Sequence, residues 1–113
     1  MKIDESYNIT FRRGDSDALP FRKSEGEFTR PEELMLTVRQ DAYGEVLLRK
    51  TVTDFTEGEA VFAFEPEDTE KMDFGTYVYD VQWKDASGRI LHIIPPEPTQ
   101  KLPKFKLTEE AGW

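Results

Sequence analysis

The chain has 113 residues, of which 37% are hydrophobic and 34% charged, with a formal net charge of −8 and no cysteine. This length fits a single domain, residues 1–113, whose packed part is expected to span about 7–108. The absence of cysteine excludes disulfides, thiol catalysis and cysteine-based metal sites. The negative charge repels nucleic acid and anionic membranes over most of the surface, so neither is expected as a partner.

The first ten residues contain no apolar segment typical of a signal peptide. No uncharged apolar run in the sequence is long enough to span a bilayer. If Met1 is the native start, we therefore expect synthesis in the cytoplasm without export through a leader.

Alternation of apolar and polar residues recurs about every ten residues in the first half of the chain, which is typical of β-strands separated by turns. Strands are predicted at 7–13, 34–40 and 46–52. A short segment at 19–22 contains Pro20 and is therefore expected at a sheet edge or a strand switch. The alternation places Ile9 and Phe11 on one face of the first strand and predicts that Leu34, Leu36 and Val38 point inward.

The second half continues the same pattern. A strand at 59–65 places Phe62 and Phe64 on one face, and Pro66 followed by acidic residues predicts a helical turn at 66–72. The segment 75–84 is predicted as a central strand, 89–94 as its partner, and 104–108 as a final edge strand after a stiff proline-rich connector. The expected fold is all-β, an immunoglobulin-like sandwich of about seven strands in two antiparallel sheets.

The run from Asp73 to Tyr79 (DFGTYVY) resembles the tyrosine corner of immunoglobulin domains. In that motif the tyrosine ring is buried while its hydroxyl binds the backbone of the preceding loop. We therefore expect structural roles for Gly75, Tyr77, Tyr79 and Trp83, with Trp83 in the core because it alternates with Val81 and Tyr79.

No catalytic constellation is recognisable, and neither an enzyme nor a cofactor is expected. His92 is the only histidine, so no histidine pair or triad can form, and strand packing or an edge position is its favoured interpretation. The serines fall in turn-like or terminal contexts without a nucleophile-elbow motif: Ser6, Ser16, Ser24 and Ser87.

Three further features have a functional and a plain structural interpretation. Clustered carboxylates at 65–73 could offer oxygen ligands to calcium but lack EF-hand spacing, so a solvated acidic loop is favoured. Asp15 and Asp17 form a weaker candidate of the same kind. The tripeptide Arg13-Gly14-Asp15 occurs in integrin ligands, yet a turn after the first strand explains it. Candidates for a carbohydrate-binding platform are the aromatic residues Tyr43, Phe55, Trp83 and Trp113.

Three segments together are similar to small immunoglobulin-like proteins of bacteriophages and prophages, akin to the amino-terminal domain of baseplate upper proteins. They are ITFRRGD at 9–15, GTYVYDVQ at 75–82 and GRILHII at 88–94. The sequence departs from that family at His92 and at Ile94-Pro95-Pro96, where the family often has threonine and glycine.

The resemblance implies a virion structural component of a tail or baseplate. It also implies a homo-oligomer in contact with other virion or tail proteins. The alternative is a module that binds glycans or a host surface, motivated by the aromatic content and by binding loops being common on this fold.

Overall fold

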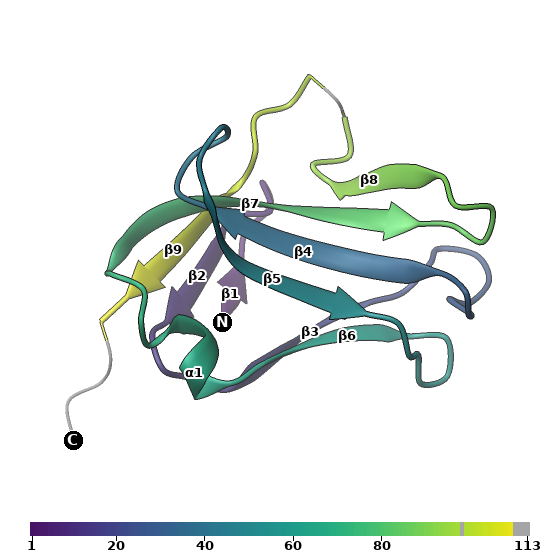
Figure 1. Ribbon diagram of the computed structural model, residues 1–113, viewed down its shortest axis with the longest axis horizontal. Coiled ribbons are helices and arrows are strands. Elements are labelled where there is room, and N and C mark those ends of the chain that lie inside the picture. The colour runs from purple at the N-terminus through teal and green to yellow at the C-terminus, as the bar shows by residue number, and fades with distance from the viewer. Residues whose placement is uncertain (98, 110–113) are drawn as a thin grey trace.

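The structure is a computed structural model that describes residues 1–97 and 99–109. Its strands form two sheets that pack face to face (Figure 1). The larger sheet has the order β1-β2-β9-β7-β4-β5, with β8 pairing to β7, and the smaller sheet contains β3 and β6. The predicted all-β sandwich is confirmed. The strands are β1 (Lys2–Ile3), β2 (Ile9–Arg12), β3 (Asp17–Phe21), β4 (Glu33–Arg39), β5 (Val46–Val52), β6 (Ala60–Phe64), β7 (Gly75–Lys84), β8 (Ile90–Ile94) and β9 (Lys104–Thr108).

The core lies between the two sheets and follows the period-two alternation. Because successive side chains on a strand point to opposite faces, every second residue of β2, β4, β6, β7 and β9 enters the same interior. The three positions predicted to point inward, Leu34, Leu36 and Val38, are buried. So are the two pairs that the alternation places on one face each, Ile9 with Phe11 and Phe62 with Phe64. Four of the buried rings are in contact around the middle of the sandwich, those of Phe11, Phe64, Tyr79 and Phe105.

The last strand, β9, does not lie at an edge as predicted. It pairs with β7 on one side and with β2 on the other, and the β2–β9 pairing is parallel. The prediction of an edge strand and of purely antiparallel sheets was therefore wrong. The reason is topological. β2 and β9 come from opposite ends of the chain and run in the same direction where they pair. Both flanks of β9 are thereby paired, and Phe105 and Leu107 are buried because they point into the core.

The strands β8 and β9 share one edge of β7. β8 pairs with the second half of β7, from Val81 to Lys84, and β9 pairs with the first half, from Gly75 to Val78. The proline-rich segment at 95–103 separates them, since proline cannot donate to the ladder. One long partner strand is thus divided into two pieces.

Two short elements complete the description. The helix α1 (Pro66–Thr69) lies within the predicted helical turn, with Pro66 in its first turn and the Asp68 carboxylate accepting a hydrogen bond from the Glu65 N–H. The strand β1 was not predicted, because two residues are too short for an alternating pattern. It pairs with β2 through a turn in which the Asp4 carboxylate accepts hydrogen bonds from the N–H groups of Ser6 and Asn8. Within the described residues, no helix is long and apolar enough to cross a membrane.

Candidate functional site

The outward side of the larger sheet is a broad surface, and we call it the outer sheet face. It spans six strands side by side, which at about 4.8 Å per spacing is roughly 24 Å across. The pleat and the pairing registers place these residues on it: Lys2, Thr10 and Arg12; Lys104 and Lys106; Thr76, Val78, Asp80, Gln82 and Lys84; Ile90 and His92; Glu33, Met35, Thr37 and Arg39; Leu47, Arg49 and Thr51.

The charge of the outer sheet face is opposite to that of the whole chain. Seven of the 15 lysines and arginines lie on it, against two of the 23 acidic residues, Glu33 and Asp80. The rest of the sequence is left with eight basic and 21 acidic residues. The net charge therefore describes the molecule as a whole and does not describe this face. Its basic residues are Lys2, Arg12, Arg39, Arg49, Lys84, Lys104 and Lys106.

Asp80 lies near the middle of this face, on the central strand β7. It stands opposite Thr37, whose hydroxyl accepts a hydrogen bond from Arg49 Nε at 3.3 Å. Burial raises the pKa of Asp80, while the charges of His92, Arg39 and Arg49 act in the opposite direction without cancelling the rise. The larger sheet thus holds a half-buried carboxylate close to Arg39 and Arg49.

Replacing Asp80 by asparagine is expected to raise the melting temperature at neutral pH. Because the folded-state pKa of Asp80 lies above its unfolded value, folding favours the protonated form, and the contribution of this group to stability falls as the pH rises through both values. The gain should therefore disappear at about pH 3, where the carboxyl is protonated in both states. Thermal melts of both proteins across this pH range would measure it.

Asp85→Asn serves as the matched control with the opposite sign. Hydrogen bonds from Ser87 and from the backbone lower the pKa of Asp85, so its removal should lower the melting temperature at neutral pH. A destabilised Asp80→Asn protein at pH 7 would show that attraction to the neighbouring cations outweighs burial.

The tyrosine corner is formed at the start of β7. The Tyr77 hydroxyl donates to the Asp73 carbonyl at 2.6 Å, and its ring is buried. Gly75 has a φ of 150°, which L side chains rarely adopt, so glycine is needed where the chain enters the strand. Two residues further on, the Tyr79 hydroxyl donates to the Tyr7 carbonyl at 2.5 Å and ties β7 to the amino-terminal turn.

Replacing Tyr77 by phenylalanine is expected to lower the free energy of unfolding by about 1 kcal/mol, because the hydrogen bond to Asp73 is lost while the ring stays buried. Urea denaturation measures the change. Tyr43→Phe is the control, since Tyr43 is fully exposed and should be neutral. Equal free energies of unfolding for Tyr77→Phe and Tyr43→Phe would contradict the structural role of the tyrosine corner.

Trp83 belongs to a cluster at one end of the sandwich. Its Nε1 donates to the Glu32 carboxylate at 3.1 Å, and Lys23 Nζ donates to the same carboxylate at 2.7 Å. The Lys23 ammonium also lies 4.9 Å from the centre of the Trp83 ring, and Phe28 meets that ring edge-on. Trp83 is partly buried against the core, and one face of its ring is already covered by a cation.

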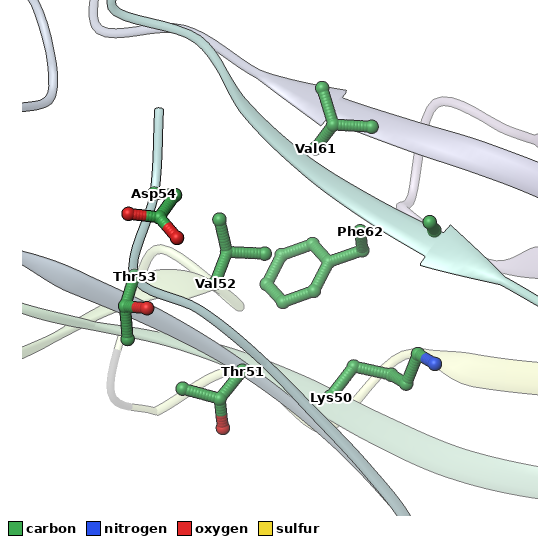
Figure 2. Close-up of a pocket in the computed structure, with 8 residues that line it drawn as sticks. Lys50, Thr51, Val52, Thr53, Asp54, Val61 and Phe62 are labelled. Carbon is green, nitrogen blue, oxygen red and sulfur yellow. The ribbon is translucent and has the colours of Figure 1, made fainter. Parts of the chain in front are cut away.

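A groove of about 300 Å³ lies between the unpaired edges of β5 and β6 (Figure 2). Val52 and Phe62 approach each other across it in Figure 2, and Thr51, Thr53 and Asp54 lie along one side. Lys50 points inward from the edge strand β5 and binds Asp68 at 2.8 Å. An inward charge of this kind discourages pairing with a strand of another molecule. Asp54, on the same side of the groove, forms an ion pair with Arg30.

The remaining sequence candidates lie apart from one another. Arg13, of the Arg-Gly-Asp tripeptide, donates to the Met72 carbonyl and stacks on Phe74, and Gly14 has a φ of 82° in the turn. In the described residues, no group of three or more His, Asp or Glu side chains converges in a way that could hold a metal ion. The acidic loop at 65–73 includes Asp68, whose pKa is lowered by the Glu65 N–H and Lys50 although burial opposes this.

The aromatic candidates do not form one platform. Phe28 contacts both Phe55 and Trp83, whereas Tyr43 lies in the β4–β5 turn at the other end of the sheet. Trp113 lies outside the described residues. His92 is exposed on the outer sheet face, 3.3 Å from the Gln82 amide nitrogen.

Sequence reasoning missed the outer sheet face. Its signal was present as the alternation of Lys104 and Lys106 with Phe105 and Leu107, which puts two cations on the side away from the core. The other cations come from strands far apart in the chain, and only the strand order assembles them.

Comparison with known proteins gives no family for this chain. Neither a scan against protein-family models nor a search of curated proteins gives a match. Among solved structures, a protein from Bacteroides vulgatus that is provisionally named a glycoside hydrolase aligns with a TM-score of 0.47 and 16% identity. The alignment covers 93% of this chain and 17% of that protein, so the chain spans less than a fifth of its length.

Proposed function

We propose that the chain is a non-catalytic structural component of a phage or prophage tail or baseplate, located in the virion. It acts through protein–protein contacts in a homo-oligomer and with other tail proteins. The phage assignment is supported by the three sequence segments at 9–15, 75–82 and 88–94. The mode of action is supported by the outer sheet face.

The outer sheet face is the observation that carries the interaction role. It is broad and built on paired strands, so that its side chains are held in fixed relative positions. It mixes cations with exposed or half-exposed apolar side chains, among them Leu47, Val78 and Ile90. Non-obligate protein interfaces are about as apolar as the rest of a protein surface, and a mixed face of this kind fits one. The half-buried Asp80 fits the same role, because an unfavourable charge placed at the centre of a face can select its partner.

Mass spectrometry of purified particles tests this proposal. Phage particles induced from the host and separated by density gradient should contain this chain in a constant ratio to the major tail protein. A matched gradient fraction from uninduced cells is the control for co-purification. Absence of the chain from intact particles, while the tail proteins are detected, would contradict the proposal.

A glycan-binding or host-surface module is the second candidate. It is motivated by the hollow beside Trp83, which is lined by Lys23, Phe28 and Ile93 among others and has a volume of about 340 Å³. The ring contact with Lys23 weakens it, because sugars stack on an open aromatic face. A glycan array compared between the native chain and Trp83→Phe tests it. Binding to one sugar class that is lost in the variant would favour this candidate.

A further inference from the structure

The two outer faces of the sandwich are complementary to each other and not to themselves. The outward side of the smaller sheet, which we call the small-sheet face, presents only uncharged side chains, all of them exposed: Ala18, Pro20, Val61 and Ala63. In a chain with 34% charged residues, a two-stranded face without a charge is unusual. It lies on the opposite side of the core from the cationic outer sheet face (Figure 1).

Acidic residues border one end of the small-sheet face. Glu65 stands immediately after β6, and the helix α1 continues directly from it with exposed Glu67 and, one residue beyond, Glu70. At the other end Glu59 forms an ion pair with Arg22 at 2.8 Å. Figure 1 shows α1 beside the end of β3 and β6, on the side of the molecule away from β8. The small-sheet face therefore has an uncharged centre and a negative margin at its α1 end.

The outer sheet face carries the opposite charge. Its apolar members, Met35, Val78 and Leu47, lie on β4, β7 and β5. Four of its cations, Lys2, Arg12, Lys104 and Lys106, lie on β1, β2 and β9, and the other three, Arg39, Arg49 and Lys84, lie among the apolar members. A face with seven cations is complementary in charge to an uncharged face bordered by carboxylates.

We propose that copies of this chain stack head to tail, with the outer sheet face of one copy against the small-sheet face of the next. The inference rests on the proposed structural role and deepens it by naming the partner, a second copy of the chain. Two outer sheet faces opposed to each other would bring seven cations against seven, and like charges at an interface cost several kcal/mol. A contact between unlike faces is heterologous, and it propagates into a ring or a filament.

The inward charge at the β5 edge favours contacts between copies through the sheet faces. An alternative route to oligomers is strand addition at β5 or β6, but Lys50 points inward at the β5 edge and pairs with Asp68. Strand addition at the β5 edge is thereby disfavoured.

A reciprocal charge exchange tests the proposal. Sedimentation velocity of the native chain from micromolar to millimolar concentration should show association that grows with concentration. Lys104→Glu/Lys106→Glu on the outer sheet face, and separately Ala18→Lys/Ala63→Lys on the small-sheet face, should each weaken association at least about tenfold, which corresponds to roughly 1.4 kcal/mol. An equimolar mixture of the two variants should recover it, because new glutamates then meet new lysines.

The controls separate the face from net charge and from misfolding. Arg89→Glu/Lys101→Glu makes the same charge change at exposed positions outside the strands, and it should associate like the native chain. Circular dichroism and thermal melts confirm that each variant is folded. Full association of both face variants, or no recovery in their mixture, would overturn the proposal. So would loss of association in the small-sheet variant alone, which would indicate a two-fold contact between small-sheet faces.

A native chain that stays monomeric at all concentrations, or binds only an acidic polymer added as a probe, also overturns the inference. These outcomes differ from failure of the proposed function. A chain that is present in particles but monomeric in solution keeps its structural role and loses head-to-tail stacking. A chain that stacks but is absent from particles keeps the stacking and loses the virion role.

Discussion

Replacing Phe105 by alanine is expected to lower the free energy of unfolding by about 3–5 kcal/mol, the range seen when a large buried ring is truncated in a core. Phe105 is completely buried on β9, and its ring centre lies 6.0 Å from that of Phe11, 6.3 Å from Tyr79 and 6.4 Å from Phe64. The substitution would leave a cavity between the two sheets where β9 joins β2 to β7. Small domains are stable by about 5–15 kcal/mol in total, so much of the protein is expected to be unfolded or near unfolding.

Urea denaturation followed by tryptophan fluorescence measures this loss. Phe105→Leu is the intermediate variant, because it retains most of the apolar volume and should cost clearly less. Tyr43→Ala is the surface control and should change the free energy of unfolding by less than about 0.5 kcal/mol, since Tyr43 is fully exposed. A loss below about 1 kcal/mol for Phe105→Ala would contradict the packing of its ring between the two sheets.

Replacing Glu32 by alanine is expected to cost about 2–4 kcal/mol, because three donors lose their acceptor. The carboxylate of Glu32 is 6% exposed and accepts hydrogen bonds from Lys23 Nζ, Trp83 Nε1 and the Thr29 N–H. Removing it leaves the Lys23 ammonium without its counter-charge beside two aromatic rings. Glu32→Gln keeps one acceptor oxygen and should lose less.

The pH dependence separates charge from packing at this position. Burial opposes the ionised form of Glu32, but Lys23, the Thr29 N–H and Trp83 outweigh it and lower its pKa. The stabilisation is therefore present above the unfolded pKa of about 4.3 and is lost as the pH falls through the lower folded value. The stability difference between the native chain and Glu32→Gln should shrink on acidification. A difference that is constant from neutral to acidic pH would assign the effect to packing alone.

The elements were predictable because they depend on local patterns. Alternation placed Ile9, Phe11, Phe62 and Phe64 on their buried faces, and Pro66 with the following acidic residues predicted a helical turn where α1 lies. The tyrosine corner was predictable for the same reason, because its donor and acceptor, Tyr77 and Asp73, are four residues apart. The prediction of no enzyme activity and of a virion role concerns chemistry and context outside the fold, and stays a prediction.

The strand order was not predictable from any local pattern. Nothing in KFKLT distinguishes an edge strand from one between β2 and β7, because both need the same inward Phe105 and Leu107. The same holds for the Trp83 cluster, in which Glu32 lies 51 residues from its tryptophan.

The amino-acid sequence by itself determined which residues of this chain face inward and where its strands turn, since both follow from a repeat of two and from the conformational limits of glycine and proline. Only the tertiary structure decided that Lys2, Arg39, Arg49 and Lys106 share one face, and that an uncharged face lies opposite them. The physical reason is that a surface combines side chains from strands distant in sequence, and their pairing register is set by the closing of the whole core.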